Sequence, residues 1–293
     1  MTNARFVFVG NRRFVLERML RENICPVHCF VVQGTHLERD LQNGLLGLGQ
    51  KEFTIIDNKI SLLDALRCLP FDVLVSNGCP YILPVAELPP ALYVNIHPSC
   101  LPDLRGIDPV IGAVLFGKDG GATCHVMDEG IDTGDIIAQV RIPLSDDLDV
   151  TTLYQLSFIA EQQVFSQSLA RAFQPLLPQR ERPGLLYYSR RPEDRIVTFQ
   201  EPNEVLLKKI KAFNNRAAGC VFTVNGRGYK VYSATRMHNP FLTEVVASFG
   251  EGVVAFSYEC CIIFGKDGEV LRLQDIVSLD DQALQVGDRL FGE

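Results

Sequence analysis

The chain has 293 residues, of which 47% are hydrophobic and 22% are charged, and its formal net charge is −7. This length suits one large domain or two modest ones, because domains typically hold about 100–200 residues. The composition is that of an ordinary globular protein. The negative charge counts against a partner rich in phosphates, such as tRNA, because a basic surface is what attracts one.

Hydrophobic runs and cysteines predict a cytoplasmic protein with no membrane partner. No apolar run reaches the roughly 18–20 residues that a membrane span requires. The run Phe6–Val9 is too short for a signal peptide, and two arginines follow it. Nine cysteines, an odd number in a long chain, favour reduced thiols over a disulfide framework.

Cys25, His28 and Cys29 lie close together in the chain, as metal ligands often do. The sequence offers no second cluster of ligands beside them. We therefore favour a strand with small buried thiols over a metal site, and we expect no metal.

Strands and helices alternate in the first half of the chain. Apolar, β-branched segments predict four strands, at residues 4–9, 27–32, 53–56 and 71–75. Apolar residues at helical spacing predict two helices, at 12–22 and 61–69, with Ser61 as the cap of the second. Strands that are nearly all apolar indicate a sheet covered on both faces. The expected fold class is therefore α/β, with a doubly wound and mostly parallel sheet.

The first strand ends in a tight turn that leads into a helix. Free amides at a helix start can hold a phosphate, so Asn11, Arg12 and Arg13 are candidates for binding a phosphate or nucleotide. An equally weighted alternative is that the two arginines are merely exposed on the first helical turn. The turn lacks the G-x-G-x-x-G pattern of dinucleotide-binding proteins.

A short apolar strand, Tyr93–Ile96, precedes the most informative polar residues. Asn95 and His97 are two residues apart, so in a strand their side chains point the same way. Pro98 holds His97 in an extended conformation and ends the strand. In open α/β sheets the carboxyl end of a strand is where ligands bind.

Asp132 lies 35 residues after His97, in the sequence G-I-D-T-G-D. Gly130 and Gly134 permit a tight loop that can return this carboxylate to the same strand end. An amide, an imidazole and a carboxylate gathered there would suit acyl transfer to an amine. A lone Asn or Asp beside glycines is usually a turn former, but the matched order of all three residues outweighs that alternative.

Two motifs, N-I-H-P-S-x-L-P-x-x-R-G and M-D-E-G-I-D-T-G-D-I, resemble the signature of the formyltransferases that use 10-formyltetrahydrofolate. That family includes methionyl-tRNA formyltransferase, glycinamide ribonucleotide formyltransferase and the N-formyltransferases of nucleotide-linked amino sugars. The resemblance covers residues 4–145 well and weakens beyond them. It implies a Rossmann-like catalytic core and 10-formyltetrahydrofolate as co-substrate.

The resemblance implies roles for the polar residues. Formyl transfer to an amine forms an oxyanion and a cationic amine, and histidine can both accept and donate a proton near neutrality. We therefore expect His97 to be the general acid/base and Asn95 to donate to the oxyanion. Asp132 would orient His97, favour its cationic form or relay a proton through water, and these three alternatives stay open. His125 is expected to support the site, with a core histidine as the alternative.

The segment 76–84 resembles the folate-binding hinge of the family, where a pterin enters an apolar cleft. The resemblance implies a first group of folate-binding residues, Cys79, Pro80, Tyr81 and Ile82. For Tyr81 the alternative is an aromatic residue that covers the core. A second group lines the other side: Met127, Asp128, Glu129, Gly130 and Ile131.

On the substrate side, the family uses the first turn, which again points to residues 11–13. Arg105 and Asp108 precede a predicted helix at 109–116 and are further candidates. Arg105 could meet a substrate phosphate, and the alternative is a salt bridge to Asp103 or Asp108.

The second half of the chain changes character after a strand at 135–144 and a helix at 153–173. The predicted domains are a catalytic domain at 1–178 and a small β-rich, OB-like domain at 195–293. Residues 179–194 are expected to connect the two domains, because this part of the chain is rich in proline. Within the connector, Tyr187 and Tyr188 are expected to lie over the first domain.

The C-terminal segment predicts one helix and several short strands. The helix is expected at 203–213, and the strands at 220–224, 228–233, 253–257, 260–264 and 270–276. Asn225-Gly226 is a strong hairpin signal. Such strands favour a small barrel or sandwich, which resembles the C-terminal domain of transfer-RNA and some sugar formyltransferases.

The leading hypothesis is a dimeric N-formyltransferase of polysaccharide biosynthesis that acts on the amine of a dTDP- or UDP-linked amino-deoxy sugar. Methionyl-tRNA formyltransferase and a small-amine, hydroxyornithine-type formyltransferase are the alternatives within the family. A folate- or nucleotide-binding module without turnover is the alternative of another class. The nucleotide, the sugar and the position of the amine stay open.

Overall fold

The computed structural model describes residues 4–258 and 261–291. The chain divides into two compact units. Unit 1 consists of Met1–Val110, Asp119–Leu144 and Tyr154–Tyr188. Unit 2 consists of Ile111–Lys118, Ser145–Leu153 and Ser189–Glu293.

Unit 1 is built on a seven-stranded sheet in the order β3-β2-β1-β4-β5-β6-β7. The pairs from β3 to β5 are parallel, whereas β6 and β7 are antiparallel additions. The strands are β1 Phe6–Gly10, β2 His28–Val32, β3 Phe53–Ile56, β4 Val73–Asn77, β5 Leu92–His97, β6 Gly120–Val126 and β7 Ile136–Ile142. This arrangement confirms the predicted α/β class and the mostly parallel sheet.

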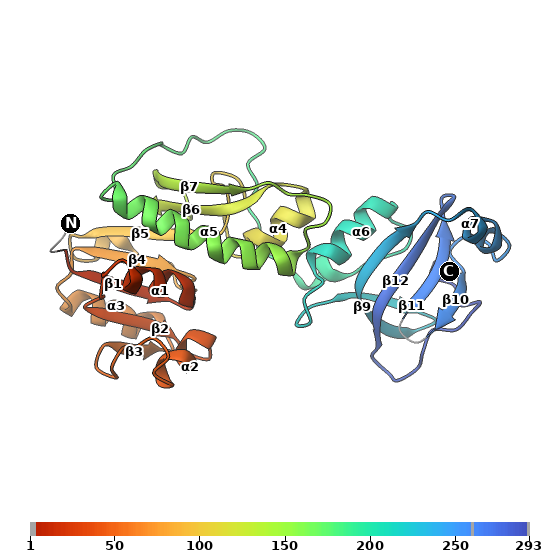
Figure 1. Ribbon diagram of the computed structural model, residues 1–293, viewed down its shortest axis with the longest axis horizontal. Helices are drawn as coiled ribbons and strands as arrows, with labels where there is room; N and C mark the ends of the chain where they lie inside the picture. Colours follow the sequence, from red (N-terminus) through yellow and green to blue (C-terminus); the bar gives the residue numbers. More distant parts are fainter. Residues whose placement is uncertain (1–3, 259–260, 292–293) are drawn as a thin grey trace. The chain divides into compact units, whose positions relative to one another are not determined.

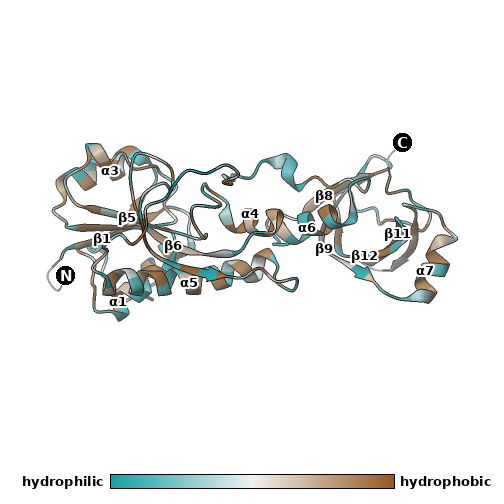
Figure 2. Cartoon of the chain, turned by 90° about the horizontal axis from the view of Figure 1, so that it is seen from above, coloured by the Kyte–Doolittle hydropathy of each residue, from teal (hydrophilic) through white to brown (hydrophobic). Residues whose placement is uncertain are grey.

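Helices cover both faces of this sheet, as the apolar strands require. Helices α1 (Arg13–Arg21), α2 (His36–Gln42) and α5 (Val150–Ala170) pack on one face in a single apolar cluster. Helix α3 (Lys59–Cys68) covers the other face with a second cluster. Figures 1 and 2 show α1 and α5 on one side of the strands and α3 on the other. Figure 2 also shows that β1 and β5, between these layers, are coloured as hydrophobic.

Local signals explain where several helices begin. Helix α3 is capped by Asn58, whose side chain accepts a hydrogen bond of 2.9 Å from the amide of Ser61. The prediction that Ser61 is the cap was therefore wrong, because Asn58 is the last residue before the helix and supplies the acceptor. Helix α2 was not predicted. Its cap is Thr35, which accepts from the amide of Glu38.

Unit 2 contains a separate five-stranded antiparallel sheet in the order β10-β11-β12-β9-β8. Its strands are β8 Cys220–Val224, β9 Arg227–Met237, β10 Val254–Tyr258, β11 Cys261–Lys266 and β12 Glu269–Ser278. Its helices include α4 Pro109–Phe116, α6 Asn203–Ala212 and α7 Pro240–Ala247, of which α7 was not predicted. The first residue of the strand expected at 260–264, Cys260, lies outside the described residues.

The hairpin between β8 and β9 has the predicted two-residue loop. Asn225 and Gly226 have φ values of 51° and 74°, and the strands end and begin on either side of them. Positive φ at both loop residues is the requirement of a type I′ turn, which explains the Asn-Gly pair. The ring of Phe199 packs edge to face against the rings of Phe222 on β8 and Phe264 on β11, with ring centres 5.1 and 5.3 Å apart.

Two further findings concern the described residues only. No helix among residues 4–258 and 261–291 is long and apolar enough to cross a membrane. Over the same residues, no group of three or more potential ligands could hold a metal ion.

Cys29 is buried in β2, and burial raises the pKa of its thiol to about 12.

Candidate active site

The carboxyl end of β5 holds the two polar side chains that its alternation predicts on one side. His97 is 5% exposed, and its Nε2 donates a hydrogen bond of 2.9 Å to the carbonyl of Leu104. The other ring nitrogen, Nδ1, lies 3.5 Å from Oδ2 of Asp132. The amide nitrogen of Asn95 lies 3.4 Å from Oδ1 of Asp132. The structure thus brings Asn95, His97 and Asp132 together.

A tight loop between β6 and β7 returns Asp132 to this strand end. Asp132 has φ +56°, a left-handed conformation that aspartate tolerates better than most residues. Two residues later Gly134 passes so close to Val126 that a Cβ would lie 1.9 Å from the Val126 carbonyl oxygen. Close packing against Val126 therefore requires glycine at position 134.

His125 joins the same cluster, because β6 pairs with β5 and puts His125 opposite Asn95. Its Nε2 lies 3.3 Å from the Asn95 amide nitrogen and 3.5 Å from Oδ1 of Asp132. Its Nδ1 donates to the carbonyl of Val126 at 2.8 Å. The side chain of His125 therefore contacts the side chains of both Asn95 and Asp132.

The carboxylate of Asp132 is held ionised. Burial alone would raise the pKa of Asp132, but its interactions with His97 and His125 and the hydrogen bond from the Gly106 amide outweigh it. The pKa of Asp132 is therefore well below its usual range. The Gly106 amide donates to Oδ2 at 3.0 Å, and Gly106 itself has φ +103°, which a side chain would oppose.

His97 has the opposite tendency. Burial lowers the pKa of His97, against the opposing effects of Asp132 and the Leu104 carbonyl, and His125 and Arg12 lower it further. The imidazole is therefore neutral at pH 7. Because its proton on Nε2 is directed to Leu104, its lone pair lies on Nδ1, the nitrogen that faces Asp132. This nitrogen is placed to accept a proton, and the adjacent carboxylate would stabilise the resulting cation.

A second buried carboxylate lies in unit 1 and was not predicted. Glu161 on α5 is fully buried and forms an ion pair with Arg12, which also lies 5.4 Å from the centre of the Phe158 ring. Burial raises the pKa of Glu161, although Arg12 and the Asn77 amide oppose the rise. The amide of Asn77 also donates to the carbonyl of Ile96 on β5 at 3.1 Å. The sequence signal that could have predicted this buried carboxylate was a single Glu among the apolar residues of the long helix α5.

The residues expected on the substrate side have protein partners. Besides the Arg12 pair, Arg13 contacts Glu17 at 2.6 Å and Asp40 at 3.2 Å. Asn11 packs so closely on Gly78 that a Cβ there would lie 2.2 Å from the Asn11 side-chain oxygen. The turn therefore joins β1 to the end of β4, and its arginines are neutralised by carboxylates.

Arg105 is 7% exposed and pairs with Glu181 at 2.5 Å. The structure gives Arg105 a partner in Glu181 rather than in Asp103, one of the two alternatives expected from the sequence. Asp103 instead contacts Arg182 at 3.1 Å, because residues 181 and 182 lie beside this loop. Asp108 is buried at 9% exposure, and its amide donates to the carbonyl of Tyr188.

The two groups expected to bind folate follow β4 and β6, the strands on either side of β5. Cys79, Tyr81 and Met127 pack against the same apolar cluster as α3. Burial raises the pKa of the Cys79 thiol to about 11. Ile82 and Ile131 are exposed at 60% and 41%. Apolar side chains from both groups are thus available to a flat ligand.

The rest of these groups is exposed or shapes a loop. Pro80, Glu129 and Gly130 are exposed. Oδ1 of Asp128 accepts hydrogen bonds from the Gly130 amide at 3.1 Å and the Thr133 hydroxyl at 2.6 Å. Asp128 therefore holds the turn that precedes Asp132.

Comparison with known proteins finds one family that part of this unit matches. The formyl transferase family profile matches residues 51–169. Methionyl-tRNA formyltransferase of Janthinobacterium sp. (strain Marseille) is 32% identical over 174 residues, which are 58% of this chain and 55% of the relative. The enzyme of the same name from Burkholderia orbicola (strain MC0-3) is 30% identical over 187 residues, 59% of this chain and 54% of the relative. The chain thus spans about half the length of the curated relatives it matches.

Solved structures resemble the chain over most of its length. WlaRD, a sugar 3N-formyltransferase in the presence of dTDP and 5-N-formyl-THF, has a TM-score of 0.69 and 18% identity, covering 95% of this chain and 99% of its own. An N-formyltransferase from Helicobacter canadensis, in complex with folinic acid and dTDP-3-aminofucose, has a TM-score of 0.68 and 19% identity, covering 92% and 99%. At these identities the likeness establishes the fold. Residues 51–169 therefore match the profile of the formyl transferases, the family whose signature the two motifs resemble.

Proposed function

We propose that this protein transfers the formyl group of 10-formyltetrahydrofolate to the amine of a nucleotide-linked amino-deoxy sugar. The observation that carries the proposal is the contact of a neutral His97, with its lone pair on Nδ1, and an ionised Asp132 at the carboxyl end of β5. The match to formyl transferases supports the reaction, and the two sugar formyltransferases of similar fold support the substrate class.

In the proposed reaction, the amine attacks the formyl carbon and His97 accepts the amine proton at Nδ1. Asp132 stabilises the imidazolium that forms, and His97 then returns the proton to the departing folate nitrogen. Asn95 donates to the oxyanion. Its contacts to His125 and Asp132, at 3.3 and 3.4 Å, are longer than the usual 2.9–3.0 Å, so one amide hydrogen can turn to a new acceptor.

Ligand binding is proposed around the same strand ends. The pterin would lie between the groups at 79–82 and 127–131, where exposed Ile82 and Ile131 offer apolar contact. The substrate would meet Asn11, Arg12, Arg13, Arg105 and Asp108. Each of the three arginines already has a carboxylate partner, so a phosphate would have to displace one.

The proposed setting is the cytoplasm, in polysaccharide biosynthesis, with a homodimer as the working form. Light scattering of the purified protein tests the oligomeric state separately from the reaction.

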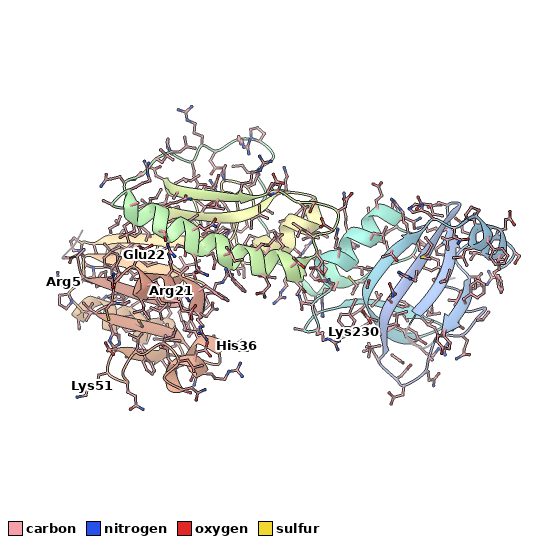
Figure 3. All side chains as sticks on the ribbon, viewed as in Figure 1. Arg5, Arg21, Glu22, His36, Lys51 and Lys230 are labelled. Atoms are coloured by element: carbon pink, nitrogen blue, oxygen red, sulfur yellow. The ribbon has the colours of Figure 1, made fainter. Side chains whose placement is uncertain are left out.

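Methionyl-tRNA formylation is the second candidate, and the curated relatives at 30–32% identity favour it. Against it stands the net charge of −7. The labelled cations Arg5, Arg21 and Lys51 lie at separate places around unit 1 (Figure 3). Binding to tRNA would weaken steeply with salt, because each phosphate contact releases counterions.

The test is an incubation of the protein with 10-formyltetrahydrofolate and one acceptor at a time. The acceptors are dTDP- and UDP-linked amino sugars, hydroxyornithine and methionyl-tRNA, and mass spectrometry detects the formylated product. The expected result is formylation of an amino sugar at a rate that salt changes little. Formylation of methionyl-tRNA alone would replace the proposal with the second candidate. Folate or nucleotide binding without any product would indicate a binding module.

A further inference from the structure

The segment after α5 folds back over the candidate site as a strap, defined here as residues 176–188. At its start, the Leu176 amide donates a hydrogen bond of 2.7 Å to the Ile136 carbonyl, and the Ile136 amide donates one of 2.8 Å to the Leu177 carbonyl. At its end, the Tyr188 amide donates to the Arg105 carbonyl at 2.9 Å. The strap therefore contacts β7, which follows the Asp132 loop, and also the loop that contains Arg105.

Gln179 is the strap residue that joins those two loops by its side chain. Its Nε2 donates to the backbone carbonyls of Asp132, at 3.0 Å, and Gly134, at 2.7 Å. Its Oε1 accepts a hydrogen bond of 3.1 Å from the guanidinium of Arg105. Both ends of the carboxamide are used, and the residue is partly buried.

The two loops meet on the carboxylate of Asp132. The Gly106 amide, next to Arg105, donates to Oδ2, the same oxygen that lies 3.5 Å from His97. The left-handed backbone of Asp132 is costly, so it needs fixed partners to persist. Gln179 supplies two such hydrogen bonds, one to the backbone carbonyl of Asp132 and one to that of Gly134.

We propose that Gln179 is a positioning residue that holds the Asp132 carboxylate against His97. This inference rests on the proposed formyl transfer and adds the requirement that the strap stays bound for the reaction to run at full rate. The charged and titratable groups that face His97 are Asp132, His125 and Arg12, and of these only Asp132 favours the imidazolium. Displacement of Asp132 therefore makes His97 a weaker base.

The test uses three variants of the full chain. Gln179→Ala removes all three hydrogen bonds. Gln179→Glu has the same shape and keeps the acceptor for Arg105, but it sets an oxygen against the carbonyls of Asp132 and Gly134. Glu181→Ala is the matched control, because Glu181 contacts Arg105 from the same strap and its side chain is 74% exposed. Among the residues that the structure describes, it has no hydrogen bond or ion pair to the Asp132 loop.

We expect kcat to fall about 10- to 100-fold in Gln179→Ala and at least as much in Gln179→Glu, with KM values within about threefold of wild type. The acidic limb of the pH-rate profile should move to lower pH, because the pKa of His97 falls when Asp132 moves away. Glu181→Ala should keep the wild-type kcat and profile. A Gln179→Glu enzyme with wild-type kcat and profile would overturn the inference, since a tether to Arg105 alone would then suffice.

A second measurement separates this inference from the proposed function. Nuclear magnetic resonance titration of the imidazole of His97, assigned by its loss in His97→Asn, needs no substrate. A lower pKa of His97 in both Gln179 variants and an unchanged one in Glu181→Ala supports the positioning role even if no acceptor is ever formylated. An unchanged pKa in correctly folded Gln179 variants overturns the positioning role even if formyl transfer is established.

Discussion

Asp132 and Glu161, two carboxylates that unit 1 largely shields from solvent, differ in the direction of their pKa shifts. Asp132 receives a backbone amide, lies near two imidazoles and the Asn95 amide, and has a lowered pKa. Burial raises the pKa of Glu161 against the opposing effects of Arg12 and Asn77, and its second oxygen has no hydrogen-bond partner among the described residues. Burial thus raises the pKa of both groups. The partners around Asp132 outweigh burial, whereas those around Glu161 do not.

The largest expected effect tests whether the Asp132 charge serves His97. Replacing His97 with Asn should lower kcat about a thousandfold, since general acid–base catalysis contributes about 10²–10⁴-fold. Steady-state kinetics measures the loss, and thermal denaturation with and without folate checks that folding and binding persist. Rates like those of wild type would show that the ionised Asp132 has no partner in the reaction.

The next effect concerns the other carboxylate. Arg12→Met should cost about 3 kcal/mol of unfolding free energy at pH 7, because it leaves a buried charge without its cation. The loss should be smaller at pH 5, where Glu161 can be neutral. Urea denaturation measures both values. The control is Arg5→Met, whose solvent-exposed pair with Asp72 should contribute little to the unfolding free energy. Equal losses of unfolding free energy in Arg12→Met and Arg5→Met would show that the buried ion pair of Arg12 stabilises the fold no more than an exposed one.

Asp132→Asn keeps the shape and removes the charge. It should lower kcat about a hundredfold, which corresponds to about 2.7 kcal/mol, and shift the acidic limb of the pH profile to lower pH. The folded pKa of Asp132 is below its unfolded value of about 3.9, so its charge contributes stability above that pH, which is lost as pH falls toward the folded pKa. The stability of the variant between pH 3 and 5 should therefore vary less than that of wild type. A stability that varied more steeply with pH in Asp132→Asn than in wild type would contradict the lowered pKa of Asp132.

The smallest effect is expected from Glu161→Gln, which should cost about 1 kcal/mol at pH 7 because Arg12 keeps an acceptor. The folded pKa of Glu161 is above its unfolded value, so the stability it contributes is present below the unfolded pKa and is lost as pH rises through the folded pKa. Gln does not titrate, so this part of the pH dependence should disappear. A cost larger than that of Arg12→Met would show that Glu161 is needed as an anion, like Asp132.

The sequence was most informative where one segment carries the signal. The alternation of Asn95 and His97, the proline after them and the Asn225-Gly226 turn are local patterns with one physical meaning each. Helix α2 was missed because it has seven residues, most of them polar, so its periodicity is weak. The partners of Arg12 and Arg105 were missed because they lie 149 and 76 residues away in the chain. No local spacing encodes such pairs, and the contacts of Gln179 were missed for the same reason.

The strap also sets how far the chain can be shortened. A fragment that stopped after α5 would retain every strand of the seven-stranded sheet but would lose the partners of the Arg105 and Asp132 loops. Truncations for crystallisation, and chimeras that exchange the segment after Tyr188, should therefore keep Tyr188 on the side of the first unit.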